Sequence, residues 1–372
     1  MAFISILFME KSSPLKVFFV FLLILLPFCQ LRILNVDFFG AKLIYAVAIW
    51  INFKKILNLK IWILVICVPL VISYIQSIRA GSTEHELLFI GILNLALFNA
   101  VFLVKIHKYL RFIVLYNTYW MLLFALGIGV VSTPEGPMFM SLNQNLFSLY
   151  IFVCYLLSQN VRKSQILNVV YTLLSIYSIL VSESRYIIFM LVLWIIYAGT
   201  RQLKTAEILR VIPFKKVVMS FVLCIMIYVI SNMSETELND LSSRALIWYL
   251  AVEQFDLFTA LGFGHTSVVS YLSLSLSSEK TSIHNVIIEV MLSSGLVGLF
   301  LFIFWIAKLF AGIDRTNPMV TFSFLVVLVY GCIGQFFGDL IVWYLIALVY
   351  EVGVYSRNVE VWRKGKAFAS FG

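Results

Sequence analysis

Two nearby stretches decide how this chain is organised. One reads Ser231-Asn-Met-Ser-Glu-Thr-Glu-Leu-Asn-Asp-Leu-Ser-Ser-Arg244, and the other reads His284-Asn-Val-Ile-Ile-Glu-Val-Met-Leu-Ser-Ser-Gly-Leu-Val-Gly298. The first is polar and the second opens an apolar run, whereas almost all of the remaining chain is apolar with short connections. A connection of about fifty residues between apolar segments is uncommon and usually carries function. We therefore expect residues 232–284 to form the one large loop of the fold.

Composition sets the class of protein. The chain has 372 residues, of which 62% are hydrophobic and 12% charged, and its mean hydropathy is +1.01. A soluble fold must cover its exterior with polar groups, so these values exclude one. Apolar runs of about 17–25 residues are long enough to cross a bilayer, and a backbone without water satisfies its hydrogen bonds as a helix. The sequence predicts an all-α polytopic integral membrane protein, with residues 1–372 forming a single transmembrane domain.

Twelve segments are candidate transmembrane helices. They are 15–34, 38–53, 60–78, 87–104, 110–131, 143–158, 166–182, 186–200, 217–231, 285–308, 319–336 and 339–355. The large loop, 232–284, falls between the ninth and tenth of them. No small-residue cleavage site follows the first segment, so we interpret it as a retained helix rather than a secretory signal.

Charge predicts which way the chain faces. With the N-terminus in the cytoplasm and alternating sides, 21 of the 27 basic residues fall on the cytoplasmic side. Cytoplasmic connections of membrane proteins carry such an excess of lysine and arginine. Both termini are then cytoplasmic, and loop 232–284 is periplasmic. The same bias accounts for the net charge of +9 without nucleic acid, because basic residues between helices also contact anionic lipids.

Metal and disulfide sites are not predicted. The five cysteines lie inside apolar runs and form no CxxC pair, so we interpret them as packing residues. His85 and His265 are isolated in the sequence, which does not support a metal cluster. Gly262-Phe-Gly264 is too short to be a phosphate-binding loop and lacks a Lys-Ser/Thr partner.

Arg185 is the first candidate site residue. It follows Ser182-Glu183-Ser184 where two apolar segments meet at the predicted outer face. An arginine there could extend to the lipid headgroups and mark a turn. The positive-inside rule disfavours arginine on this side, however, and ionisable residues at membrane depth are often functional.

Arg244 opens an amphipathic run near 243–255 in the large loop. Apolar and aromatic residues recur there at helical spacing, which suits a helix lying on the membrane surface. Arg244 could contact lipid phosphate, and the same planar guanidinium suits a lipid pyrophosphate. Trp248 and Tyr249 are candidate substrate-binding residues in this run.

His284 is the third candidate, and Asn285 and Glu289 accompany it. Asn285 and Glu289 are four residues apart and share one face of the tenth helix. The imidazole of His284 titrates near neutral pH and could accept a proton from a sugar hydroxyl. The alternative is a histidine that marks the water boundary. Ser293, Ser294, Gly295 and Gly298 would let a neighbouring helix approach closely.

These motifs together resemble the O-antigen ligase and polymerase superfamily of bacterial inner membranes. The residues that carry the resemblance are Ser182-Glu-Ser-Arg185-Tyr, Ser243-Arg244-Ala-Leu-Ile-Trp248, Gly262-Phe-Gly264, His284-Asn-Val-Ile-Ile-Glu289 and Ser294-Gly-Leu-Val-Gly298. Their order, spacing and predicted membrane side agree with the family over about residues 180–300. The first half of the chain resembles it only as a series of hydrophobic segments.

The resemblance implies a GT-C-like fold and a metal-independent glycosyltransferase without a cofactor. The donor would be an oligosaccharide on undecaprenyl pyrophosphate, used at the periplasmic face of the inner membrane for lipopolysaccharide biosynthesis. Arg185 and Arg244 would hold the leaving pyrophosphate, and His284 would orient or deprotonate the acceptor hydroxyl. Asn285 and Glu289 would contact substrate. Membrane lipids, a chain-length regulator and a flippase are candidate partners.

The acceptor divides the family, and three alternatives stay open. A polymerase joins repeat units, whereas a ligase transfers finished glycan to lipid A-core. The loop between Arg244 and His284 is short, about forty residues, whereas ligases of the family tend to have a longer one, so the resemblance favours a polymerase. A flippase or other transporter would show internal repeats and charges along a central path, whereas this chain concentrates polar residues in one outer loop.

Overall fold

The structure is a computed structural model. It describes residues 14–24, 32–33, 36–37, 40–53, 65–81, 86–133, 136–139, 144–160, 165–182, 184–202, 243–275, 285–332 and 339–369. Regular structure in these ranges is helical apart from two short antiparallel hairpins, which confirms the predicted helical class. One hairpin pairs β1 (Arg32–Ile33) with β2 (Val36–Asp37), and the other pairs β3 (Val130–Thr133) with β4 (Gly136–Phe139).

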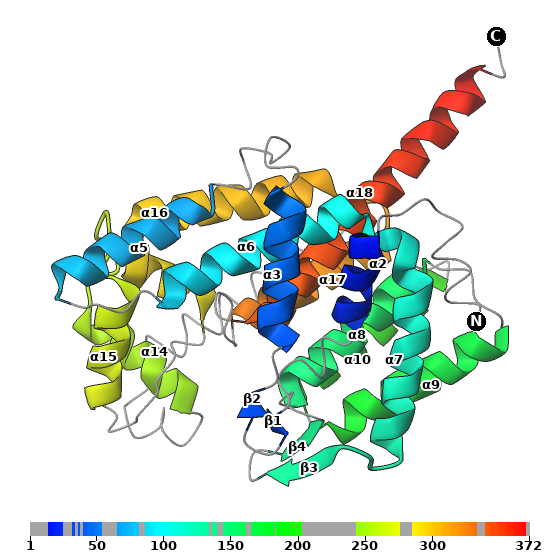
Figure 1. Cartoon of the computed structure of the whole chain (residues 1–372), viewed down its shortest axis with the longest axis horizontal. Helices are drawn as coiled ribbons and strands as arrows, with labels where there is room; N and C mark the ends of the chain where they lie inside the picture. Colours follow the sequence, from blue (N-terminus) through cyan, green and yellow to red (C-terminus); the bar gives the residue numbers. More distant parts are fainter. Residues whose placement is uncertain are drawn as a thin grey trace.

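Figure 1 shows the helices in chain order. They are α2 (Pro14–Ile24), α3 (Gly40–Phe53), α5 (Cys67–Arg79), α6 (Glu86–Val104), the 3₁₀ helix η3 (Ile106–Tyr109), α7 (Leu110–Ala125), α8 (Gln144–Ser158), α9 (Gln165–Val181), α10 (Arg185–Gln202), α14 (Ser243–Gln254), α15 (His265–Ser275), α16 (Val286–Gly312), α17 (Pro318–Gly331) and α18 (Leu340–Ala369). The main packing pairs are α5 with α16, α6 with α3 and α18, and α17 with α8 and α18.

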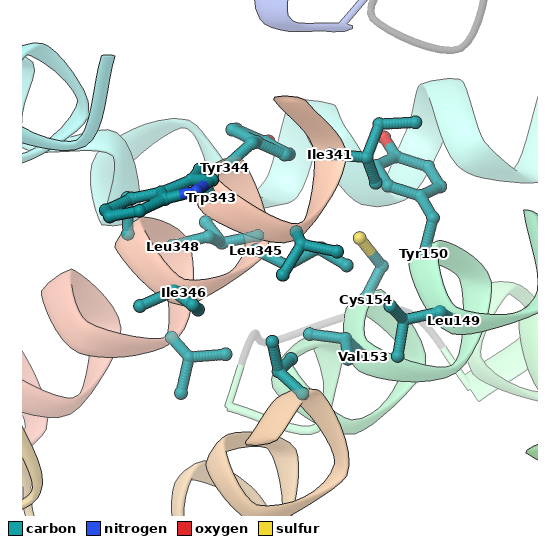
Figure 2. Close-up of a cluster of buried hydrophobic side chains, with 14 of the residues drawn as sticks. Leu149, Tyr150, Val153, Cys154, Ile341, Trp343, Tyr344, Leu345, Ile346 and Leu348 are labelled. Carbon is teal, nitrogen blue, oxygen red and sulfur yellow. The ribbon is translucent and has the colours of Figure 1, made fainter. Parts of the chain in front are cut away.

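The core lies where α8 and α18 meet (Figure 2). Leu149, Tyr150, Val153 and Cys154 of α8 lie beside residues 341–348 of α18, and these side chains are almost completely buried. Because these parts of the two helices are buried on all their faces, the predicted spans in this region are continuous apolar runs in the sequence. A helix that is apolar all round is buried in a protein core or a membrane.

Other helices expose apolar side chains. Ile166, Leu173 and Leu180 are exposed along α9, and Phe300 and Ile303 are exposed on α16. An exposed apolar surface of this extent is typical of helices that face lipid. These apolar helices therefore agree with membrane localisation.

The structure gives a partial view of the twelve predicted transmembrane helices. In the described ranges, two helices are long and apolar enough to cross a membrane, Val286–Gly312 and Leu340–Val359. A third span is possible by the same criteria if the bent pair of α6 and α7 is counted, and further apolar helices have 10–17 residues. The count of twelve is not confirmed. The predicted span 217–231 lies outside the described ranges. Of the predicted loop 232–284, the structure describes residues 243–275.

Two predicted segments end earlier than expected. Segment 110–131 was expected to continue through β3, but α7 ends at Ala125 and the chain enters the β3–β4 hairpin. Segment 15–34 includes β1, in which Arg32 is the strand partner of Asp37 in β2. Between α6 and α7 the direction changes by 71°, where Lys105 adopts a left-handed conformation with φ +59°. The sequence predicts two separate crossings at 87–104 and 110–131; the structure has two helices joined by a sharp bend there, and that they are separate crossings stays a prediction.

Segments that the charge bias assigns to the cytoplasm meet at one end of the molecule. The side-chain amide of Asn317, which precedes α17, donates to Asn160 at 2.7 Å and to Ser356 at 3.2 Å. Ser356 in turn donates to Asp314 at 2.8 Å. The end of α8, the connection between α16 and α17, and α18 therefore meet where the alternating topology expects them. Which side of the membrane this end faces stays a prediction.

Candidate functional site

The helix α16 is broken at Gly295. This residue has φ +69° and ψ −166°, so the helix consists of two halves on either side of it. In an uninterrupted helix, Leu296 N–H would donate to Leu292 O, and Val297 N–H to Ser293 O. The break leaves these four backbone groups without those partners. Buried backbone groups need others, because an unpaired one costs free energy comparable to a lost hydrogen bond.

The loop Thr259–Gly264 supplies the partners. It runs through the break and pairs with all four groups. The bonds are Leu296 N to Thr259 O (2.9 Å), Val297 N to Ala260 O (3.2 Å), Phe263 N to Leu292 O (2.7 Å) and Gly264 N to Ser293 O (3.1 Å). Two helical hydrogen bonds are thus replaced by four bonds to a loop. Irregular backbone at membrane depth is tolerated only where it is buried in protein or lines a polar cavity.

Glycine is required at the contact between loop and break. Gly262 has φ +69°, and a Cβ there would lie 2.6 Å from both Gly295 N and Leu292 O. A Cβ on Gly295 would lie 2.4 Å from Ala260 O. Both approaches are to backbone atoms, which cannot rotate away. The motif Gly262-Phe-Gly264 therefore has a structural role in seating the loop, which sequence spacing alone did not indicate.

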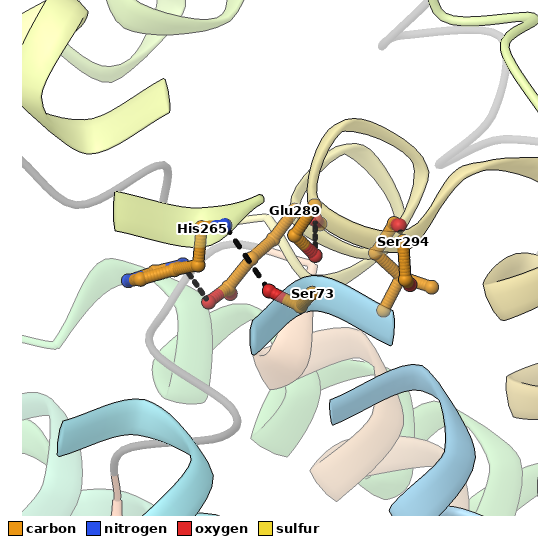
Figure 3. A network of polar contacts seen from close by, with 6 residues as sticks. Ser73, His265, Glu289 and Ser294 are labelled. Carbon is orange, nitrogen blue, oxygen red and sulfur yellow. Dashed lines mark hydrogen bonds and ion pairs between the residues drawn. The ribbon is translucent and has the colours of Figure 1, made fainter. Parts of the chain in front are cut away.

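His265 and Glu289 face each other beside this break (Figure 3). His265 begins α15 directly after the loop, and its Nδ1 lies 3.3 Å from Glu289 Oε1 of α16. The contact is within ion-pair distance but lacks hydrogen-bond alignment. The Glu289 side chain is 6% exposed and that of His265 is 22% exposed. Glu289 lies in the first turn of α16 and next to the start of α15, where helix dipoles favour a negative charge.

Ser73 ties this pair to a third helix. The backbone N–H of His265 donates to Ser73 Oγ of α5 at 3.1 Å, which satisfies one of the unpaired donors at the start of α15. Ser73 is itself buried. The site is therefore formed by α5, α15 and the half of α16 before Gly295.

Asn285 caps α16. Its Oδ1 accepts hydrogen bonds from Ile287 N at 3.1 Å and Ile288 N at 3.2 Å, and the residue is fully buried. An asparagine oxygen that satisfies the first N–H groups of a helix stabilises its start. Asn285 and Glu289 are one turn apart, as the spacing predicts. Substrate binding by Asn285 and Glu289 stays a prediction.

Small side chains follow along α16. The hydroxyl of Ser293 donates to Glu289 O, and that of Ser294 donates to Val290 O at 2.9 Å. Such bonds to the preceding turn are common where a helix bends. Gly298 lies against Pro69 of α5, and a Cβ there would be 3.6 Å from the proline Cβ. These residues let α5 pack closely, as expected.

A helix, α14, occupies the predicted amphipathic run. Trp248 is buried against Val268 of α15 and Ile288 and Leu292 of α16. Its indole therefore packs on protein, whereas the sequence suggested an aromatic at the membrane surface. Tyr249 is half-buried. Arg244 lies in the first turn of α14, and its side chain is outside the described part of the structure.

Arg185 lies on another group of helices. It is exposed at the first position of α10, which packs against α8 and α9 and lies apart from α14 and α15 (Figure 1). The preceding Ser184 donates to Asn145 Oδ1 of α8 at 2.8 Å. This bond joins the start of α8 to the start of α10. The structure does not bring Arg185 together with the His265–Glu289 pair.

His284 lies outside the described residues, one position before the cap of α16. The prediction that Arg185, Arg244 and His284 form one site is therefore not tested. His265 and Ser73 were not among the predicted site residues, because an isolated histidine gives no signal until its partner is known. Within the described ranges, no three or more His, Cys, Asp or Glu side chains are grouped to hold a metal ion.

One comparison bears on what this arrangement does. The family model described as O-antigen ligase matches residues 170–303, from α9 to the part of α16 beyond its break. The match confirms the resemblance to the O-antigen ligase and polymerase superfamily over this stretch. Members of this family are glycosyltransferase-like enzymes that act on lipid-linked glycans. No curated protein matches the chain.

Proposed function

We propose that this protein is an O-antigen polymerase, a metal-independent glycosyltransferase of the bacterial inner membrane. It would join oligosaccharide repeat units carried on undecaprenyl pyrophosphate at the periplasmic face. The observation that carries the proposal is the family match over residues 170–303, which includes Arg185, Arg244 and His284 in order. The buried Glu289, Ser293 and Ser294 before the loop-filled break of α16 support placing the chemistry there.

The proposed reaction forms one bond and breaks another. The acceptor hydroxyl oxygen attacks the anomeric carbon of the donor sugar, and the bond from that carbon to the pyrophosphate oxygen breaks. His284 accepts the hydroxyl proton or orients the hydroxyl for attack. Arg185 and Arg244 stabilise the negative charge that develops on the leaving pyrophosphate. The activated sugar–phosphate bond supplies the driving force, so no nucleotide is needed.

A ligase is the second candidate. The description of the matching family model favours it, since that description is O-antigen ligase. The length of the loop favours the polymerase: about forty residues separate Arg244 from His284, and ligases of the family that this chain resembles tend to have a longer loop. Both enzymes would use the same donor and the same leaving group, so the acceptor alone separates them.

Lipopolysaccharide from a deletion strain distinguishes the candidates. A polymerase predicts lipopolysaccharide that carries a single repeat unit when the gene is deleted. A ligase predicts core without O-antigen, and polymer accumulating on the lipid carrier. Loss of repeat units from the periplasmic side altogether, with lipid-linked units retained in the cytoplasmic leaflet, would indicate a flippase and would overturn the proposal.

Single substitutions test the residues. R185A, R244A and H284A, each returned to the deletion strain, should shorten or abolish the glycan ladder, since removing one charge-stabilising group costs about 10²–10³ in rate. R315A is the matched control: Arg315 is also an exposed arginine, but it lies at the opposite end, where it donates to Phe310 O. Unchanged ladders for all three variants would contradict the assigned roles.

A further inference from the structure

His265 is held at three points before its ring meets Glu289. Gly264, the residue before it, donates to Ser293 O of α16. The N–H of His265 donates to Ser73 Oγ of α5, and Gly264 O accepts from Val268 N as α15 begins. The backbone of His265 is therefore fixed between two helices. A histidine that only marked the water boundary would not need its backbone held by three hydrogen bonds.

Glu289 keeps capacity for a further hydrogen bond. Among the described residues, His265 Nδ1 is the polar group in contact with its carboxylate, and that contact is not aligned as a hydrogen bond. An ionised carboxylate has two oxygens and about four acceptor positions. The Glu289 side chain is 6% exposed, and most acceptor positions of its carboxylate have no hydrogen-bond donor among the described residues. It is therefore positioned to accept a hydrogen bond from a ligand.

We propose that His265 is a positioning residue of the glycosyl-transfer site, acting through Glu289. Its Nδ1 lies at ion-pair distance from the carboxylate and limits where the carboxylate can lie, and the carboxylate accepts a hydrogen bond from a hydroxyl of the acceptor sugar. This inference rests on the proposed function, because it takes Glu289 as a substrate contact. A carboxylate suits a sugar hydroxyl, since a hydrogen bond to a charged acceptor is shorter and stronger than a neutral one.

A second histidine–glutamate pair in this chain provides the control. His107 of η3 contacts Glu351 of α18 through both its backbone N–H, at 2.8 Å, and its ring Nδ1. The ring also stacks on Tyr355, with centroids 3.9 Å apart. Both oxygens of Glu351 are thus used within the protein. A variant at His107 should affect folding alone.

Four variants test the proposal in membranes that contain the full-length protein. H265F keeps a ring and removes both nitrogens, whereas H265N keeps an N–H near the Nδ1 position. We expect H265F to lower turnover of lipid-linked repeat units at least about tenfold, because misplacing a substrate-contacting group can cost up to about 10² in rate. H265N should keep most of the wild-type turnover. S267A on the same helix and H107F should match wild type per folded molecule.

Binding of the lipid-linked repeat unit separates positioning from a structural role. H265F should bind it as wild type does while turning it over more slowly. E289Q and the double variant E289Q/H265F should have equal turnover, because His265 acts through Glu289. Wild-type turnover in H265F, or a further tenfold loss in the double variant relative to E289Q, would overturn the proposal.

Two further outcomes keep the test decisive. If H265F does not accumulate, H265Q replaces it: this variant moves its N–H away from the Nδ1 position and should lose turnover that H265N retains, and the reverse order would overturn the proposal. The proposed function fails differently, since wild-type membranes would then form no polymer from repeat units and R185A and H284A would change nothing.

Discussion

The two histidine–glutamate pairs show how the same residues serve different purposes. His107 and Glu351 engage through two contacts and an aromatic stack at the end of the molecule where the basic connections gather. His265 and Glu289 engage through one contact that lacks hydrogen-bond alignment, beside a helix break filled by a loop. Both carboxylates are buried, at 4% and 6% exposure of the side chain.

Burial alone therefore does not identify a functional carboxylate here. A buried charge whose hydrogen bonds are all met within the protein is part of the scaffold. One that retains acceptor capacity is more often a site that a ligand completes, because an unsatisfied buried polar group is costly. On this argument, Glu351 holds α18 against η3, and Glu289 is the proposed substrate contact.

The largest effect on stability is expected at Glu351. E351A leaves the N–H of His107 and its ring without their buried partner. Breaking a buried pair by removing one member costs about 3–5 kcal/mol. Thermal denaturation in detergent should show a correspondingly large drop in Tm, whereas turnover per folded molecule should stay at the wild-type value. An unchanged Tm would contradict the scaffold role.

Gly295 is the next most sensitive position. G295A places a Cβ 2.4 Å from Ala260 O and favours a continuous helix, which would expel the loop. We expect a loss of about 1–2 kcal/mol for the left-handed conformation plus about 1–3 kcal/mol for the clash. Turnover should fall with it, because His265 follows the loop.

Gly81 provides the matched control for Gly295. It also has positive φ, at +85°, but a Cβ there has nothing within 4 Å. G81A should therefore cost only the conformational part, about 1–2 kcal/mol, and leave turnover unchanged. Equal losses of stability in G81A and G295A would show that the loop is not seated in the break as described.

The two asparagine caps sharpen the comparison at a smaller scale. Asn285 caps α16 and Asn317 caps α17, each by accepting two backbone N–H groups. N285A should cost about 1 kcal/mol, since a cap residue contributes roughly that amount, and N317A should cost more, because its amide also donates to Asn160 and Ser356. If Asn285 also contacts substrate, N285A alone should lower turnover. Equal turnover in the two variants, measured per folded molecule, would leave Asn285 as a cap only.

The smallest effect is expected at Asp314, between α16 and α17. Burial raises the pKa of this carboxyl, but hydrogen bonds from Thr316, Ser356 and backbone N–H groups outweigh it, so the net pKa is lowered. A carboxyl with a lowered folded-state pKa contributes stability above its unfolded pKa and loses it as pH falls through the folded value. D314N should therefore flatten the loss of Tm in acid. The same slope in wild type and D314N would contradict this.

Local features of the fold could be predicted from the sequence. The apolar runs predicted helices. Asn285 and Asn317-Pro318 lie at helix starts, where asparagine caps and proline are favoured. The charge bias assigned to one side several segments that meet at one end of the molecule. Each of these depends on residues that are close in the chain or on a sum over many residues.

The break and the pair beside it could not be predicted. Gly295 alone is compatible with a continuous helix, and what breaks it is a loop more than thirty positions earlier in the chain, since Leu296 N bonds to Thr259 O. The bond between His265 and Ser73 spans 192 residues. No periodicity relates such positions, because their meeting depends on how the helices pack. Bent helices also made the count of spans unpredictable, as at Lys105.

The most direct test of the account compares E289Q with E351Q. Both changes keep the shape of a buried, histidine-paired side chain and remove its charge. The account predicts that E289Q lowers turnover of lipid-linked repeat units at least about tenfold per folded molecule, because it weakens a contact to the reacting acceptor. E351Q should lower Tm and leave turnover near wild type. Wild-type turnover in E289Q, or an equal loss in both variants, would contradict the central claim.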